Sequence, residues 1–219
     1  NSVQFCPHDA GGQLLASGGA DNEVFIHDLG RPDQPSVYAP SEAGSRKHDA
    51  PVSSVAWNLQ VMHIMASASR NGSCIIWDLR QKRPWCELKD PNRQAFSAIA
   101  WNPPGSPQVL LVTASDDDIR PVIRLWDLKK STSTPIVELG GQQGHRRGIL
   151  SVAWNPHDDG TIVSCGKDDR TLVWDLYHAK VVRDLTAEEQ KASAGGAGAN
   201  GAVGMASLEH LVAVVALLV

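Results

Sequence analysis

Hydrophobic positions along this chain fall in short runs, and Gly, Pro, Asn or Asp residues bound most of them. The runs are rich in Val, Ile, Leu and Trp, and turn-forming residues separate them, which is a pattern typical of β-strands. The pattern therefore predicts an all-β fold class.

Three kinds of run recur in the same order four times, which indicates internal repeats. The third kind ends in Asp-Leu, and its closing Asp residues are 50, 49 and 48 positions apart. The predicted strands are Val3–Phe5, Leu14–Gly18 and Val24–Leu29; Val55–Trp57, Ile64–Ser69 and Ile75–Leu79; Ile99–Trp101, Leu110–Ser115 and Ile123–Leu128; Val152–Trp154, Ile162–Gly166 and Thr171–Leu176.

A weaker fourth run follows the third in two repeats, at Pro84–Leu88 and Pro135–Leu139. Proline at the start of such a run suits an outer edge strand, because an edge needs fewer ladder hydrogen bonds. Each repeat therefore predicts a four-stranded sheet. One such sheet cannot bury both of its faces alone, so the sheets are expected to stack around an axis.

The Trp-Asp endings resemble those of WD repeats, whose pattern adds a His, a Ser or Thr, and a turn Asp. By this resemblance, His145, Ser164, Asp168 and Trp174 form a structural hydrogen-bond relay. A near match with Asn in place of Asp comprises His48, Ser67, Asn71 and Trp77. The other two repeats depart further, since His27 replaces a Trp and the repeat ending at Trp126 lacks a His. We expect looser blades there.

Composition narrows the class of protein. The 219 residues carry a net charge of −4 without a basic stripe, which argues against a nucleic-acid partner. The four Cys residues include no C-x-x-C pair, so we predict free thiols in a reducing cytosol.

No set of residues indicates catalysis or a cofactor. The carboxylates of Asp116–Asp118 are consecutive, whereas a cation-binding loop needs spaced ligands and a turn glycine, so we predict a solvated turn and no metal. His145 and Asp168 lack a nucleophile motif, and their repeat positions already explain them. We therefore predict no enzymatic activity, no small-molecule substrate and no cofactor. Trp85 lies off the repeat pattern and is the candidate exposed contact residue.

Finer details resemble one family, the larger subunit of the COPII outer coat. Ser54–Ser69, followed by Trp77–Arg80, is similar to that family's W-N-x-Q-V-x-H-I-L-A-S-A-S run and its W-D-L-R sequence. Asp117–Ile123 matches its lengthened D-D-x-x-P-V-I turn. The passages His145–Trp154 and Ser164–Asp168 resemble its R-G-I-L-x-x-A-W and S-C-G-K-D sequences.

The resemblance implies a WD-repeat β-propeller with about four of about seven blades present. It also implies a scaffold role in vesicle transport from the endoplasmic reticulum to the Golgi. The partners would be the smaller outer-coat propeller subunit and other coat subunits, engaged mostly through regions absent here. The location would be cytoplasmic, peripheral on endoplasmic-reticulum exit sites and COPII-coated vesicles, with no direct membrane insertion.

Two other function classes stay open. One is a generic WD-repeat adaptor, such as a ubiquitin-ligase substrate receptor or a histone-binding protein, and the other is a hydrolase built on a propeller.

The propeller is expected to cover residues 1–185, with blades missing before it, and a Gly/Ala-rich linker with a short apolar tail to cover 186–219. Leu211–Val219 is too short for a membrane span, which needs about 20 residues. It is a docking element, a shortened anchor or non-native sequence, and we favour the last.

Overall fold

The computed structural model describes residues 1–31, 33 and 48–187 and contains fifteen strands in four antiparallel sheets. The first sheet comprises β1 (Ser2–Phe5), β2 (Leu14–Gly18) and β3 (Val24–Asp28). The second comprises β4 (Val52–Trp57), β5 (Ile64–Ser69), β6 (Ser73–Asp78) and β7 (Arg83–Lys89). The third comprises β8 (Phe96–Trp101), β9 (Leu110–Ser115), β10 (Ile123–Asp127) and β11 (Val137–Leu139). The fourth comprises β12 (Ile149–Trp154), β13 (Thr161–Gly166), β14 (Thr171–Asp175) and β15 (Lys180–Asp184).

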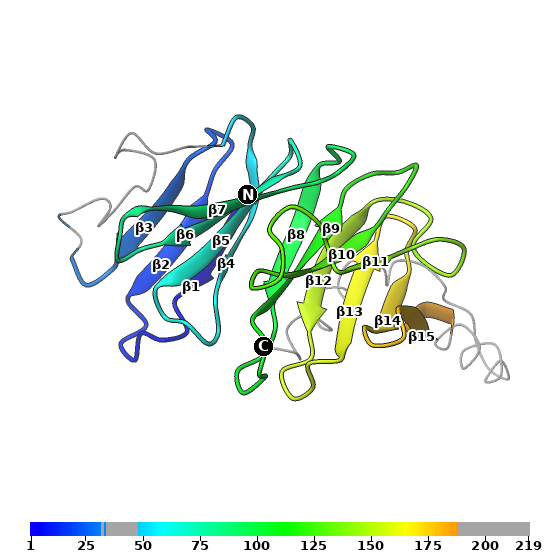
Figure 1. Cartoon of the computed structure of the whole chain (residues 1–219). Helices are drawn as coiled ribbons and strands as arrows, with labels where there is room; N and C mark the ends of the chain where they lie inside the picture. Colours follow the sequence, from blue (N-terminus) through cyan, green and yellow to red (C-terminus); the bar gives the residue numbers. More distant parts are fainter. Residues whose placement is uncertain (32, 34–47, 188–219) are drawn as a thin grey trace, which may run out of the picture.

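The four sheets stand side by side in chain order, each packed on the next (Figure 1). Within each sheet the strands follow one another along the chain, as expected for hairpin-linked antiparallel strands. The inner strands β1, β4, β8 and β12 contact one another in turn, so they line the inside of the arc. The prediction of stacked β-sheets is therefore confirmed, and residues 188–219 of the predicted linker and tail lie outside the described residues.

One predicted outer strand is shorter than expected. The run Pro135–Leu139 yields a strand only from Val137, although the Ile136 amide still donates to the Leu125 carbonyl at 2.8 Å. Pro135 has no N–H to continue the ladder, which explains why the strand starts later than predicted.

Three apolar cores hold the stack together, one between each pair of neighbouring sheets. We call the face that a sheet turns to the preceding sheet its rear face, and the opposite face its front face. In the second sheet the rear face carries larger side chains than the front face. The rear face comprises Val55, Trp57, Met65, Ile75 and Trp77, and the front face comprises Ala56, Ala66, Ala68, Cys74 and Ile76.

Tryptophans of the inner strands also form hydrogen bonds between sheets. Trp57 Nε1 donates to the Gln4 carbonyl, and Trp101 Nε1 donates to the Ala56 carbonyl, both at 3.1 Å. A buried indole N–H needs an acceptor, and the preceding sheet supplies it. The equivalent Trp154 instead donates to the Asp159 carbonyl of its own sheet, at 3.1 Å.

We expect the Trp126→Ala substitution to lower the free energy of unfolding by about 3–5 kcal/mol, because this ring is fully buried between the second and third sheets. The matched control is Trp85→Ala, which truncates a ring that is 55% exposed and should change stability by less than about 0.5 kcal/mol. Urea unfolding followed by circular dichroism measures both. Equal losses for the two variants would contradict the assignment of the core.

Candidate functional site

The fourth sheet brings all four predicted relay residues together. Trp174 Nε1 donates to Ser164 Oγ at 2.7 Å, and Ser164 Oγ lies 2.8 Å from His145 Nε2. His145 Nδ1 lies 2.8 Å from Asp168 Oδ1. An indole can only donate and a carboxylate can only accept, so the hydroxyl proton of Ser164 points to Nε2 and the imidazole proton sits on Nδ1.

Burial fixes the protonation states along this relay. Desolvation lowers the pKa of His145, and the opposing attraction of Asp168 does not cancel the effect. Burial raises the pKa of Asp168, but the Arg146 amide and His145 outweigh it, and the net shift is downward. The relay therefore joins a neutral imidazole to an ionised carboxylate, which suits a static hydrogen-bond chain.

The second sheet keeps only part of the predicted relay. His48 Nε2 lies 2.7 Å from Ser67 Oγ, which accepts a hydrogen bond from Trp77 Nε1 at 2.8 Å. Asn71 does not complete the relay, so that expectation is wrong. Its exposed side chain caps its own turn, where it accepts hydrogen bonds from Ser69 Oγ and from the Ser73 amide. His48 Nδ1 is left buried without a hydrogen-bond partner among the described residues.

The other two sheets keep the last link of the relay despite their sequence departures. Trp126 Nε1 donates to Thr113 Oγ1 at 3.0 Å. In the first sheet His27 stands in for the indole, with its Nε2 2.8 Å from Ser17 Oγ. The hydrogen bond between a third strand and a second-strand hydroxyl is thus present in all four sheets, and the expected looseness of these blades stays a prediction.

A buried ion pair, which we did not predict from the sequence, occupies the rear face of the third sheet. The Arg124 guanidinium pairs with Asp90, contacts Gln94 Oε1 at 3.3 Å and donates through Nε to Glu138 Oε2 at 3.0 Å. Arg124 is almost wholly buried. The signal that could have revealed it is a charged residue at a repeat position that Ile75 and Leu172 fill in other sheets.

Asp90 is itself held by the backbone that joins β7 to β8. It accepts hydrogen bonds from the Asn92 amide at 2.7 Å and from the Gln94 amide at 3.1 Å. A buried charge of this kind needs both a counter-ion and hydrogen bonds. The network therefore fixes the connection between the second and third sheets.

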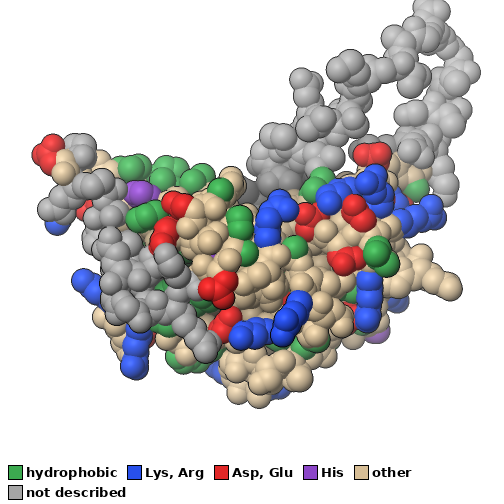
Figure 2. All heavy atoms as spheres, turned by 90° about the horizontal axis from the view of Figure 1, so that it is seen from above, with side chains coloured by type: hydrophobic (Ala, Val, Ile, Leu, Met, Phe, Trp, Pro, Cys, Tyr) green, Lys and Arg blue, Asp and Glu red, His purple; other side chains and the backbone are tan. Residues whose placement is uncertain are grey.

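The acidic triplet Asp116–Asp118 is not the freely solvated turn that we predicted. Asp116 lies 3.4 Å from Arg70 of the second sheet and 2.5 Å from Lys167 of the fourth. Asp118 accepts a hydrogen bond from the Gly148 amide at 2.8 Å. Figure 2 shows charges of both signs interspersed over the face that carries these turns. The triplet thus connects three sheets along one rim.

The middle carboxylate stabilises the turn itself. Asp117 Oδ1 accepts hydrogen bonds from the Arg120 amide at 2.6 Å and the Ile119 amide at 2.8 Å, and these amides hold its pKa below the usual range. Across the part of the chain that the structure describes, no group of three or more His, Cys, Asp or Glu side chains is placed to hold a metal. The described segments also contain no helix long and apolar enough to cross a membrane.

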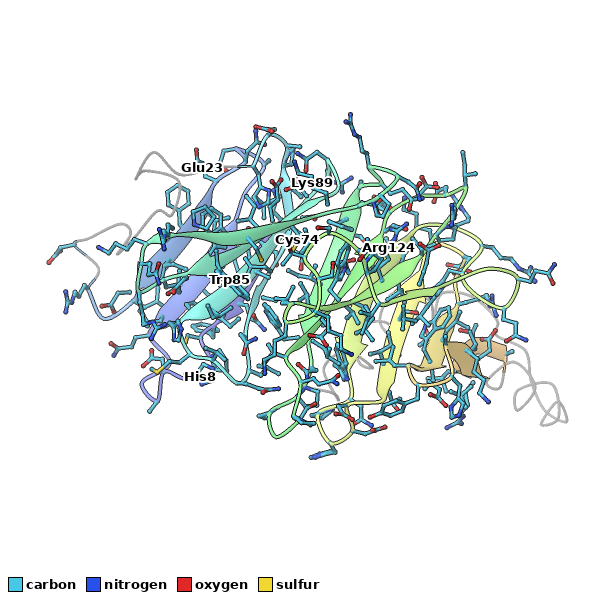
Figure 3. The ribbon with its side chains drawn as sticks, in the orientation of Figure 1. His8, Glu23, Cys74, Trp85, Lys89 and Arg124 are labelled. Atoms are coloured by element: carbon cyan, nitrogen blue, oxygen red, sulfur yellow. The ribbon has the colours of Figure 1, made fainter. Side chains whose placement is uncertain are left out.

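Trp85 lies on β7, the outer strand of the second sheet, and its ring is exposed (Figure 3). Ile76 pairs with Cys86 and Trp77 with Pro84, so Trp85 is the extra residue of a β-bulge. The same bulge in the fourth sheet presents Val182, which is also exposed. A bulge re-aims a side chain, and here it presents an apolar residue on the outer edge.

The chain matches the WD40 family (WD domain, G-beta repeat) over residues 44–78 and 136–175. These two segments contain the two relays that include a His. The repeats outside them are those in which His27 and Arg124 depart from the pattern. The departures are thus in the two repeats that the WD40 family does not match.

Known protein transport proteins are similar to this chain. It is 40% identical to the protein transport protein SEC31 of Dictyostelium discoideum over 173 residues, which cover 78% of this chain and 12% of that protein. It is 42% identical to Sec31A of Danio rerio over 178 residues, which cover 81% of this chain and 13% of that protein. The chain thus spans only about an eighth of the length of these relatives.

A solved structure of COPII on membranes, at the outer coat vertex, is similar in fold. Its TM-score is 0.68 at 34% sequence identity, and the match covers 82% of this chain and 47% of that chain. A second structure, of the COPII coat assembled on membranes, has the same TM-score and identity and is covered to 26%.

The two relays generate a reciprocal prediction. Asp168→Asn should lower the free energy of unfolding by about 1–3 kcal/mol, because His145 Nδ1 loses a charged acceptor. Asn71→Asp should raise it by about 0.5–1.5 kcal/mol, because a carboxylate can cap Ser73 and also reach the unpaired His48 Nδ1. Chemical unfolding at neutral pH measures both, and changes of the same sign in the two variants would contradict the relay.

His48 generates a prediction about pH. Burial lowers its pKa to about 4, against 6.5 for an ordinary His. Between these pH values the imidazole of His48 is protonated in the unfolded chain but not in the folded chain. The free energy of unfolding therefore falls as the pH drops from about 6.5 to about 4, by up to about 3 kcal/mol. His48→Gln should flatten this slope in unfolding curves, and the exposed His157→Gln is the matched control. A slope that His48→Gln leaves unchanged would refute the assignment.

Proposed function

This chain is a WD40-repeat homologue of the Sec31 transport proteins, and on that premise we propose that it is a scaffold propeller of a COPII-type outer coat. It acts through protein–protein contacts in vesicle transport from the endoplasmic reticulum to the Golgi. The observation that carries the proposal is the match to the COPII outer coat vertex, at 34% identity over 82% of the chain. At that identity the likeness extends beyond the fold shared by WD40 propellers.

The geometry supports a structural role for the residues that most resemble catalytic ones. His145, Ser164 and Asp168 have the residue types of a hydrolytic triad, but His145 and Ser164 are buried. The Ser164 hydroxyl is bonded both to the imidazole and to the Trp174 indole. A nucleophile needs an accessible oxygen, so this arrangement favours a scaffold over an enzyme.

The proposal includes a place and a set of partners. The chain would work in the cytoplasm, as part of a peripheral coat at endoplasmic-reticulum exit sites and on COPII-coated vesicles. Its partners would be other coat subunits, including the smaller outer-coat propeller subunit. Since the chain spans about an eighth of the similar transport proteins, we propose that most of these partners bind the whole protein outside this segment.

Trp85 is the contact residue that we propose for this role. Its exposed ring lies on β7, the outer strand of the second sheet, which pairs with β6 along one edge. Exposed tryptophans of this kind are enriched among the residues that dominate binding energy at protein interfaces. Ile136 and Val182 occupy the corresponding positions of the third and fourth sheets, so the outer strands of these three sheets each present one apolar residue.

A chimera tests the function. The chimera is Sec31 in which the matching propeller segment is replaced with this chain. It is expressed in cells depleted of their own Sec31, and the time that a secretory cargo takes from the endoplasmic reticulum to the Golgi is measured. We expect transport at a rate within about twofold of normal, and a strong loss when the chain carries Trp126→Ala, which disrupts a core between sheets. A chimera that accumulates to normal levels yet leaves cargo in the endoplasmic reticulum would reject the coat function.

The contact residue is tested in the same cells. Trp85→Ala should slow cargo delivery several-fold without lowering the amount of folded chimera, since the ring is exposed. Met62→Ala, which truncates another exposed apolar side chain, is the control and should leave transport unchanged. Normal transport by the Trp85 variant would remove Trp85 from the interface and leave the coat function standing.

A further inference from the structure

Two of the thirteen prolines in the chain directly follow a hydroxyl-bearing residue, in the dipeptides Ser106-Pro107 and Thr134-Pro135. A proline restricts the residue before it to an extended backbone. Proline-directed protein kinases modify Ser or Thr in this setting, so the sequence alone makes the two dipeptides equal candidates for phosphorylation. The structure places their hydroxyl groups in different surroundings.

The Ser106 hydroxyl joins two sheets. Ser106 is half-buried in the turn after β8, and its Oγ donates to Asp159 Oδ2, in the turn between β12 and β13, at 2.7 Å. The same carboxylate accepts a hydrogen bond from the Tyr177 hydroxyl, also at 2.7 Å. A phosphate on Ser106 would break the bond between the third and fourth sheets and place its negative charge against Asp159. The fold therefore disfavours modification of Ser106.

The Thr134 hydroxyl lies in the irregular segment between β10 and β11, where Thr134 is exposed. Thr134 Oγ1 lies 3.0 Å from Ser131 Oγ, and the Ser133 and Thr134 amides both donate to Ser131 Oγ at 3.1 Å. These bonds join residues of one loop, and none of them holds two sheets together. The loop can therefore rearrange around a larger group on Thr134 while the sheets keep their packing.

Two lysines immediately before this loop supply positive charge. Lys129 and Lys130 are both exposed, and Lys130 makes a loose ion pair with Asp127 at 3.6 Å. Lys130 directly precedes Ser131, the residue whose hydroxyl contacts Thr134. The lysine stems are long and flexible, so a phosphate on Thr134 would attract their ammonium groups and be stabilised by charge-assisted hydrogen bonds.

We propose that Thr134 is a phosphorylation site for a proline-directed protein kinase. The kinase transfers the γ-phosphoryl group of ATP to Thr134 Oγ1. A bond forms between this oxygen and the γ-phosphorus, the bond from that phosphorus to the bridging oxygen breaks, ADP leaves, and the hydroxyl proton goes to a base of the kinase. The modified side chain carries about −1.5 to −2 charges at pH 7.

The modified side chain would lie beside an apolar contact residue. Ile136, two positions after Thr134, is 39% exposed and is one of the three apolar residues that the outer strands present. A partner that covers Ile136 would have to remove water from the phosphate, and desolvation of a charge is unfavourable. Phosphorylation should therefore weaken binding at this edge. This consequence rests on the proposed function, whereas the site itself does not.

Phosphorylation of the purified 219-residue chain tests the site. The chain is incubated with ATP and a cyclin-dependent kinase, which is proline-directed, and mass spectrometry of peptides locates the phosphate. We expect one phosphate, on Thr134, and its loss both in Thr134→Ala and in Pro135→Ala, which keeps the hydroxyl and removes the proline. Ser106→Ala is the matched control and should leave incorporation unchanged. An unmodified wild-type chain, or phosphate that appears on Ser106 or on Thr132 instead, overturns the proposal.

The consequence for binding is tested in the Sec31 chimera. Thr134→Glu should slow cargo delivery several-fold, because it places a charge beside Ile136. Thr134→Gln, which has a similar size and no charge, is the control and should leave delivery unchanged. Normal delivery by the Thr134→Glu chimera would overturn the effect on binding. If the chimera with the unchanged chain already fails, the coat function is rejected, and the kinase assay still decides the site.

Discussion

The structure depends on one constraint, which is that every sheet has two apolar faces and can bury neither alone. Large rear-face side chains such as Trp57 and Met65 pack on small front-face residues such as Ala16, and this arrangement repeats between successive sheets. Because burial of apolar area drives the stacking, the positions of strands, turns and rim charges follow from the packing of neighbouring sheets. The relays and ion pairs refine that packing and do not replace it.

The relay of the fourth sheet has the residue types of a hydrolase triad, but it holds the structure together instead of transferring a proton. In a catalytic triad the serine hydroxyl must be reachable and the imidazole must accept its proton during the reaction. Here the Trp174 indole bonds to the oxygen of Ser164, and burial keeps His145 neutral. The same donors and acceptors that could pass a proton therefore lock a turn onto the strand beside it.

Much of the fold could be read from the repeats, because strand positions follow from alternating burial and turn residues. The spacing of 23 residues that joins His145 to Asp168 also joins His48 to Asn71, yet only the first pair meets. The two pairs differ in charge, because Asp168 is a carboxylate and Asn71 is a neutral amide. The Asn71 oxygen already accepts hydrogen bonds within its own turn, so a further bond to a neutral imidazole would add little stability. The ion pair of Arg124 could not be predicted because its counter-ion, Asp90, is 34 positions away, in the segment that connects two repeats. The Trp85 bulge depends on strand register, which the sequence does not encode locally.

The sheets contact only their neighbours, so the chain behaves as a row of coupled units, as in repeat proteins whose stability is a sum of unit and interface terms. Among the described sheets, the first packs against one neighbour, and it has Phe5 at the position where the second and third sheets have a tryptophan bonded to the preceding sheet. The second and third sheets are packed on both sides and are linked by the buried Arg124–Asp90 pair. Within the described part of the chain, the first sheet is therefore held by fewer contacts than the second and third. Amide protons of β2 would exchange with solvent well before those of β9, with no change in the average structure.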